Sequence, residues 1–196
     1  MIDNFINTWP EYELVIEPQA IYEHSSKRLI VMHEWERPIM ESKADFICKD
    51  GGHILELGFG MGISATAIQQ YNIKSHTICE MHPQIIKKLK EWQKDKLNVK
   101  ILEGDWYDNI KNFEKYDGIL FDTYRDPSTS LFKEILSKIA NVGCKVTWWN
   151  NRDNNFNQFD LDNTKFRKIK VNPPKNNYFN KSTYWMPQYL YTGDTL

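Results

Sequence analysis

The 196-residue sequence has no excess of charge of either sign, because 25 Lys and Arg residues oppose 26 Asp and Glu residues and leave a net charge of -1. This balance argues against proteins that bind nucleic acids or membrane surfaces, which carry a basic excess or patch. No apolar run approaches the roughly 20 residues that span a bilayer, and the first residues lack a basic stretch followed by an apolar one. We therefore expect no nucleic-acid partner, no membrane insertion and no secretion.

Cysteine is also scarce. Cys48, Cys79 and Cys144 are far apart, odd in number and set in apolar runs, which favours reduced, buried thiols and a cytoplasmic protein over a disulfide or zinc framework. The five histidines form no H-x-x-x-H pair, there is no C-x-x-C pair, and no serine lies in a G-x-S-x-G motif. We expect no metal site and no acyl-transfer chemistry.

The sequence does contain enough apolar residues, 41%, for one well-packed domain spanning residues 1–196, and it shows no internal repeat. Residues 1–18 carry aromatic side chains without a period, which predicts an irregular arm or lid over a pocket. In residues 19–48 the apolar positions fall roughly at helical spacing, interrupted by Pro38, which predicts a cap of two short helices. Residues 49–196 would form the core.

In that core, short apolar runs alternate with helical or turn patterns. The runs HILELGFG, HTICEM, VKILEGD, GILFDTY and KVTWWN predict parallel strands joined by right-handed crossovers, which is the α/β class. The last two runs, FRKIKV and STYWMPQYLYT, have no helix between them and predict an antiparallel hairpin. Of the neighbours Trp148 and Trp149, one is expected in the core and one in a pocket, because successive strand residues face opposite sides.

Three turns in this core indicate a nucleoside-binding site. The loop from Glu56 to Gly62, E-L-G-F-G-M-G, follows the first strand and precedes a helix, so its glycines permit close backbone approach to a ligand. Glu80 ends the next strand, at the separation at which an acid binds a ribose hydroxyl pair. Asp105 and Trp106 form a third turn suited to an adenine edge and face. A bare tight turn, a helix N-cap at Asp105 and ordinary packing of Trp106 remain alternatives.

The order of these turns resembles the class I S-adenosylmethionine-dependent methyltransferases, which have a Rossmann-like fold with a mostly parallel seven-stranded sheet. That resemblance places Glu56 near the methionine part of the cofactor, Glu80 at the ribose, and Asp105 and Trp106 at the adenine.

Two further carboxylates lie where a second substrate is expected. Asp122 ends the fourth strand, and ligands of open α/β sheets bind outside the carboxyl ends of the strands. Glu36 lies in a segment unusually rich in methionine and tryptophan. Taken alone, Asp122 could instead be a cap or loop acid. Glu36 by itself reads as a surface charge paired with Arg37 or a lysine.

The segments VMHEWERPIM, GGHILELGFGMG and DGILFDTY are similar to the guanidinoacetate N-methyltransferases and the related fungal arginine δ-N-methyltransferases. The resemblance runs from about Trp9 to Gln188. It implies that Glu36 and Asp122 bind a guanidino group, that Trp9 belongs to a lid, and that Asn151 and Arg152 hold the substrate carboxylate through their backbone amides. The cofactor contacts that it implies are Met32, Met40, Gly58, Phe59, Gly60, Met61, Gly62, Ile63, Glu80, Met81, His82, Asp105 and Trp106.

The chemistry explains why two carboxylates are needed. A guanidinium has five N–H donors in a planar fork, so two acids can bind it from two sides and orient one nitrogen toward the methyl donor. The cation must then lose a proton to become a nucleophile, although its pKa lies above about 12. We assign Asp122 mainly to this base role and Glu36 to orientation, and the assignment could be reversed.

The sequence departs from the family between the fifth and sixth strands, where only about 15 residues of Asn- and Asp-rich loop stand in place of a helix and longer insertions. This shortening predicts a less covered sheet face and, as its consequence, a possible homodimer. It also leaves two roles for the Arg152 side chain, a clamp on the substrate carboxylate or an ordinary solvated arginine.

The sequence thus predicts an S-adenosylmethionine-dependent N-methyltransferase that acts on the guanidino group of a small molecule such as guanidinoacetate or arginine. Methylation of arginine side chains in a protein or peptide is one alternative. An inactive cofactor-binding subunit that partners an active enzyme is another, although the retained Glu36, Asp122 and glycine loop argue against it.

Overall fold

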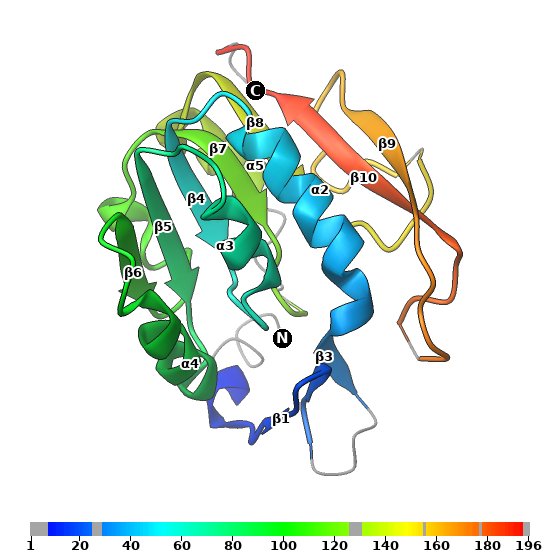
Figure 1. The fold of residues 1–196 in the computed structure, drawn as a ribbon. Coiled ribbons are helices and arrows are strands. Elements are labelled where there is room, and N and C mark those ends of the chain that lie inside the picture. The colour runs from blue at the N-terminus through cyan, green and yellow to red at the C-terminus, as the bar shows by residue number, and fades with distance from the viewer. Residues whose placement is uncertain (1–7, 25–28, 126–130, 155, 177, 194–196) are drawn as a thin grey trace.

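The computed structural model describes residues 8–24, 29–125, 131–154, 156–176 and 178–193 (Figure 1). Seven strands form one sheet in the order β6-β5-β4-β7-β8-β10-β9, and the first five in this order pair in parallel. Strand β10 pairs antiparallel with both β8 and β9, which confirms the predicted terminal hairpin. The strands span β4 His53–Leu57, β5 Ser75–Glu80, β6 Val99–Glu103, β7 Tyr116–Phe121, β8 Ala140–Trp148, β9 Lys165–Lys170 and β10 Thr183–Leu190.

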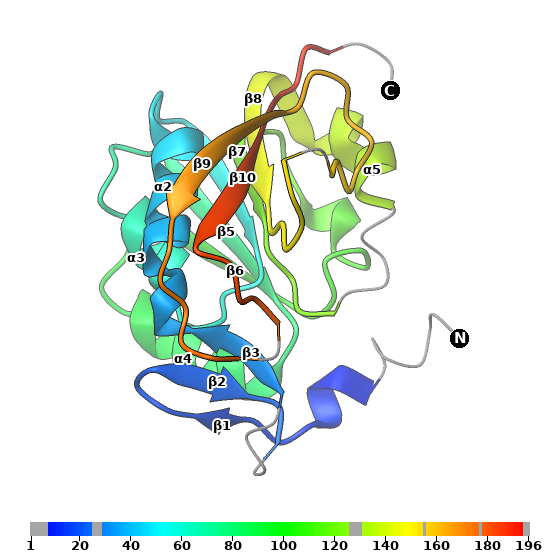
Figure 2. The same cartoon turned by 90° about the vertical axis from the view of Figure 1, so that its right-hand side faces the viewer.

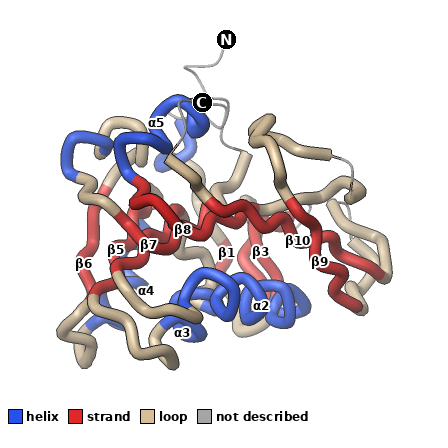
Figure 3. Tube along the Cα trace, turned by 90° about the horizontal axis from the view of Figure 1, so that it is seen from above, coloured by secondary structure: helices blue, strands red, loops and turns tan. Residues whose placement is uncertain are grey.

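Helices cover both faces of this sheet, which explains why its central strands read as continuous apolar runs. Helices α2, α3 and α4 lie on one face and α5 on the other (Figure 3). Helices α2 and α4 carry a proline in their first turn, where its missing N–H and fixed φ are tolerated. The bounds are α2 Arg37–Cys48, α3 Ile63–Ile68, α4 Pro83–Gln93 and α5 Phe132–Ile139, with a 3-10 turn η3 at Ile110–Asn112.

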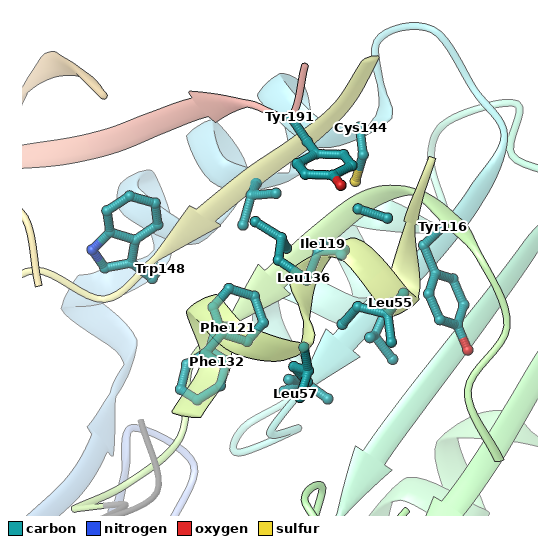
Figure 4. Close-up of a cluster of buried hydrophobic side chains, with 14 of the residues drawn as sticks. Leu55, Leu57, Tyr116, Ile119, Phe121, Phe132, Leu136, Cys144, Trp148 and Tyr191 are labelled. Atoms are coloured by element: carbon teal, nitrogen blue, oxygen red, sulfur yellow. The ribbon is translucent and has the colours of Figure 1, made fainter. Parts of the chain in front are cut away.

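The largest apolar cluster lies between the sheet and α5 (Figure 4). Phe121 from β7 and Phe132 from α5 have ring centroids 4.6 Å apart, and Trp148 at the end of β8 belongs to the same cluster. This packing fixes the carboxyl end of β7, directly before Asp122. The expectation for the tryptophan pair is confirmed, because Trp148 is buried in the core while Trp149 lines a cavity.

The N-terminal segment differs from its prediction. Residues 19–48 were expected to form two short helices, yet the described part of this range, 19–24 and 29–48, contains two strands, a 3-10 turn and a single α-helix, α2. Strands β1 Val15–Ile16, β2 Ala20–Tyr22 and β3 Ile30–His33 form a separate antiparallel sheet beside the main one (Figure 2), flanked by η1 Trp9–Glu11 and η2 Glu34–Glu36. The helical interpretation fails because Ile21 and Met32 are buried by pairing across strands rather than by one helix face.

The loop between β8 and β9 also corrects an expectation. Its described residues contain no helix, but Phe159 and Leu161 are buried in the cluster beneath α5. The Phe159 ring lies 4.9 Å from Phe132 and 5.1 Å from Trp148. The loop therefore covers the sheet face that was expected to be bare, and the reason given for a homodimer does not hold.

Within the described ranges, no helix is long and apolar enough to cross a bilayer.

Candidate functional site

A cavity of about 340 Å³ opens at the carboxyl ends of the parallel strands, in the size range of small-molecule sites. The loops after β4, β5, β6, β7 and β8 all reach it, and the N-terminal sheet, η2 and α2 close its side. Of the predicted site residues, the cavity brings together Trp9, Met32, Glu36, Met40, Gly58, Phe59, Gly60, Glu80, Met81, Asp105, Trp106, Asp122 and Asn151.

The glycine loop after β4 depends on conformations that only glycine adopts without strain. Gly58 has a φ of +91°, and a Cβ there would lie 2.2 Å from the backbone oxygen of Asp122. Gly60 has a φ of +52°, and its Cβ would lie 2.6 Å from the sulfur of Met32. The loop thus packs directly against both the end of β7 and strand β3, and it exposes backbone toward the cavity.

Glu80, the last residue of β5, holds this loop in place. Its Oε2 accepts a hydrogen bond from the Phe59 N–H at 2.9 Å, and its Oε1 accepts from the N–H groups of Met81 and His82. Burial raises the pKa of this carboxyl above its ordinary value, while the N–H donors oppose the rise. Glu80 also lines the cavity, so the acid that orders the glycine loop stands at the cavity wall.

At the third turn, Asp105 and Trp106 have local structural roles and also line the cavity. Asp105 Oδ1 accepts from the Tyr107 N–H at 2.7 Å, which is the local bond expected of a turn acid. Trp106 is buried in the main cluster, edge-on to Phe121 at 5.3 Å. Both residues nevertheless line the cavity. Packing therefore holds the indole in place at the cavity wall.

Six predicted site residues are not part of the cavity lining: Glu56, Met61, Gly62, Ile63, His82 and Arg152. Glu56 is fully buried, accepts a hydrogen bond from the Ser64 hydroxyl, and lies 2.9 Å from His76 Nε2. Its hydrogen-bond partner Ser64, which the sequence analysis did not identify, lines the cavity. Glu56 therefore supports the wall of the cavity through Ser64 and does not face the cavity itself.

His82 and Arg152 also make their contacts outside the cavity lining. His82 caps α4 through Nδ1, and its Nε2 lies 2.9 Å from the backbone oxygen of Tyr12, so it anchors the N-terminal arm. The Arg152 guanidinium stacks over Phe156 at 5.2 Å, and its backbone N–H donates to Asn150 Oδ1. The solvated reading of Arg152 is favoured, and its amide is already used within the loop.

The arm itself reaches the cavity through Trp9. This indole is buried, with its centroid 4.9 Å from the Tyr124 ring and 5.1 Å from the His82 ring. Tyr124 in turn donates from its hydroxyl to Glu23 Oε2 at 2.9 Å. Trp9 therefore joins the loop after β5 to the loop after β7 across the cavity mouth.

Glu36 is buried, with 4% of its surface exposed, rather than a surface charge; Arg37 pairs with Glu34 instead. Its Oε1 accepts from the Tyr178 hydroxyl at 2.6 Å and from the His33 N–H at 2.8 Å. Burial, which outweighs these hydrogen bonds, raises the pKa of Glu36 to about 8. Glu36 is therefore mostly protonated at neutral pH.

Asp122 faces the same cavity and has a partner that the sequence did not reveal. Its Oδ2 lies 2.6 Å from the ammonium of Lys43, a completely buried lysine of α2. The Asp122 side chain remains 21% exposed, toward the cavity. Lys43 follows Glu36 by seven residues, two helical turns, and this spacing on an apolar helix face was the signal that could have revealed it. Tyr178, in the irregular stretch before β10, had no such signal.

Among the described residues, no group of three or more His, Cys, Asp or Glu side chains could hold a metal ion. The cavity instead brings a glycine loop and the buried acid Glu80 together with the two carboxylates Glu36 and Asp122. This combination suits a nucleoside and a cationic second molecule.

Comparison with known proteins agrees with this geometry. The family model of guanidinoacetate N-methyltransferase matches residues 16–151, more than half of the chain. The chain belongs to this family. The sheet order is that of the class I methyltransferase fold, and a precorrin-6y C5,15-methyltransferase from Geobacter metallireducens has a TM-score of 0.60 at 11% identity, covering 83% of this chain and 90% of its own.

Two curated relatives carry the name protein arginine N-methyltransferase 2. The Candida glabrata protein is 39% identical over 135 residues, which is 63% of this chain and 31% of that protein. The Saccharomyces cerevisiae protein is 40% identical over 109 residues, 49% of this chain and 26% of that protein. The matched region thus covers under a third of the length of these relatives.

Membership in the guanidinoacetate N-methyltransferase family implies S-adenosylmethionine as cofactor, and the residues present fit it. The left-handed conformations of Gly58 and Gly60 let the loop pack tightly against Asp122 and Met32 at the cavity wall, and Glu80 and Asp105 line the same cavity with carboxylate acceptors. Trp106 offers an aromatic surface for a base.

Proposed function

We propose that this chain transfers a methyl group from S-adenosylmethionine to a guanidino nitrogen. The observation that supports the proposal is that Glu36 and Asp122, 86 positions apart in the sequence, line the same cavity as the glycine loop and Glu80. Gly58, Gly60, Glu80, Met81, Asp105 and Trp106 would hold the cofactor.

When bound, S-adenosylmethionine supplies an electrophilic methyl group on a positively charged sulfur. The chain must orient one guanidino nitrogen toward that methyl and remove a proton from the cation. Glu36 binds the guanidinium from the side of η2 and Tyr178. Asp122 binds it from the end of β7 and accepts the N–H proton as the new N–C bond forms. Trp9 and Tyr124 exclude water from the mouth of the site.

The acceptor is either a small guanidino molecule or an arginine side chain of a peptide. The family description favours the first, and the names of the curated relatives favour the second. A methylation assay with guanidinoacetate, free arginine and an arginine-containing peptide separates them, read by mass spectrometry. Methylation of none of these compounds would contradict the proposed function.

The first prediction tests the ribose site. Replacing Glu80 by Gln keeps the shape of the side chain but removes the negative charge. The hydrogen bonds from ribose hydroxyls and backbone N–H groups then go to a weaker, neutral acceptor. We expect S-adenosylmethionine to bind about 1.5–3 kcal/mol more weakly, the range of hydrogen bonds to charged groups. Calorimetry on the folded variant measures the change. Glu103→Gln, at the exposed end of β6, is the matched control, and unchanged affinity in Glu80→Gln would remove the ribose assignment.

The second prediction tests the lid. Trp9→Ala removes the indole that bridges Tyr124 and His82, so we expect kcat/KM to fall by at least about tenfold through weaker closure over the ligands. Trp185→Ala, which removes an indole of β10 packed against Lys168, is the control for general loss of packing. Full activity in the folded Trp9 variant, or an equal loss in both, would argue against a lid.

The third prediction concerns pH. Because the pKa of Glu36 is raised to about 8, the carboxylate that binds the cation is a minority form below that pH. Acceptor affinity should therefore rise with pH by up to about tenfold per unit between pH 6 and 8 and level off above it. Binding at pH 7 should release a proton, which calorimetry in buffers of different ionisation enthalpy detects.

Glu36→Gln is the matched variant for this pH dependence. It should raise KM more than it lowers kcat, because orientation acts in the ground state and the transition state alike. It should also flatten the pH profile of binding. A profile that keeps its slope in Glu36→Gln would assign the titration to another group.

A further inference from the structure

The buried lysine of α2 is a charged group beside the cavity that the proposed mechanism does not use. Lys43 has no exposed surface, and its ammonium lies 2.6 Å from Asp122 Oδ2. Its surroundings are otherwise aromatic, with Nζ 5.2 Å from the Trp149 ring centroid and 5.8 Å from that of Tyr184. A lysine is seldom buried without a paired charge, and here Asp122 supplies that charge.

Its first consequence is geometric. Lys43 approaches Asp122 from α2, outside the cavity lining, and uses Oδ2. The described part of the chain makes no bond to Oδ1. An acceptor entering the cavity therefore meets a carboxylate with one oxygen already held, which fixes the orientation of the other and restricts Asp122 to a single strong contact.

Its second consequence is the charge of the site. The charged groups around Lys43 are Asp122 and Glu36. Asp122 is in direct contact with Lys43, and Glu36 interacts electrostatically with both Lys43 and Asp122. The Tyr184 hydroxyl is engaged by backbone, since it accepts from the Asn150 N–H and donates to the Trp148 oxygen. With a guanidinium and a sulfonium both bound, three positive charges would lie near Glu36 and Asp122, the carboxylates that interact with Lys43, while Glu80, Asp105 and Arg125 also line the cavity.

We propose that Lys43 is a positioning residue that disfavours the protonated acceptor: its fixed positive charge behind Asp122 drives the bound guanidinium to give up the proton that methyl transfer requires. This inference rests on the proposed function. While the N–H proton is on Asp122 the net charge of the site is unchanged; it falls by one when Asp122 releases the proton to solvent, a release that Lys43 favours because it stabilises the Asp122 carboxylate, and a neutral guanidino nitrogen with a lone pair remains.

The opposing effect on binding makes the proposal testable. Two positive charges about 5 Å apart at an effective dielectric constant of about 20 repel strongly enough to change an affinity on the order of 100-fold. Removing the charge of Lys43 should therefore tighten binding of a cation while slowing its methylation. A lysine that merely supports the fold would weaken both.

The binding experiment compares L-arginine with L-citrulline, its uncharged isostere, by calorimetry on the full chain saturated with S-adenosylhomocysteine. It is run at pH 9, above the pKa of about 8 to which burial raises Glu36. Lys43→Met removes the charge and the donor, Lys43→Gln keeps a donor without the charge, and Lys43→Arg keeps both. Lys145→Met, which removes a lysine paired with Asp50 away from the cavity, is the control.

We expect the ratio of arginine to citrulline affinity to rise at least tenfold in Lys43→Met and Lys43→Gln and to stay near wild type in Lys43→Arg and Lys145→Met. With the acceptor found by the methylation panel, KM and kcat should both fall in the two uncharged variants. An unchanged or lower ratio in a folded Lys43→Gln protein would overturn the inference. A panel without a guanidino acceptor, together with the raised ratio, would remove the proposed function and leave the charge effect of Lys43 standing.

Discussion

Asp122→Asn should lower kcat by about 100-fold or more on any guanidino acceptor, the loss typical of a missing general base. The amide keeps the shape of the side chain and one acceptor oxygen, but it cannot take the proton of the guanidinium. It also leaves the Lys43 ammonium without its counter-charge, so the cation of the acceptor meets net repulsion at the end of β7. Steady-state kinetics at saturating cofactor measures the effect.

Asp117→Asn is the matched control for this substitution. Asp117 lies near the start of β7, the strand that Asp122 directly follows, and its carboxylate accepts from the His53 N–H and the Asn141 amide. Both variants lose a partly buried charge at one end of β7, and of the two only Asp122 lines the cavity. If Asp122→Asn turned over the acceptor at a rate near wild type, or if both variants lost activity equally, Asp122 would not be the base.

The residues at the carboxyl ends of the strands were predictable because a parallel sheet covered on both faces makes each strand a continuous apolar run. Such a run ends visibly where a carboxylate or glycine follows, as at Gly58, Glu80, Asp105 and Asp122. The hairpin at the end of the chain was predictable for the same reason, since two apolar runs without an intervening helix leave only antiparallel pairing.

The N-terminal sheet and the partners of the two carboxylates were not predictable in this way. Strands β1, β2 and β3 have two to four residues each, too short to separate a strand period from a helical one, and pairing across the turn decides their conformation. Lys43 is buried only because Asp122 reaches it from another element, and Tyr178 meets Glu36 across 142 positions. Such contacts depend on the assembled fold.

The same dependence on the assembled fold makes Gly58 the second position where a large effect is expected. Gly58→Ala places a Cβ 2.2 Å from the backbone oxygen of Asp122, in a backbone conformation with φ +91°. Strand pairing resists the required shift, because the Gly58 N–H donates to Cys79 and the Asp122 N–H donates to Leu57. Either the glycine loop or the Asp122 backbone must move, so one methyl group disturbs both halves of the site.

Gly143→Ala separates the two causes of this effect. Gly143 has a nearly identical φ of +89°, but a Cβ there meets nothing within 4 Å. In Gly143→Ala the free energy of unfolding, measured by urea titration, should fall by only about 1–2 kcal/mol, which is the strain of a left-handed alanine. Gly58→Ala should lose at least about 2 kcal/mol more, in the range of overpacked sites, and should also weaken both S-adenosylmethionine and acceptor binding. Equal losses in the two variants, with ligand binding intact, would show that the loop and Asp122 are not held in contact at this point.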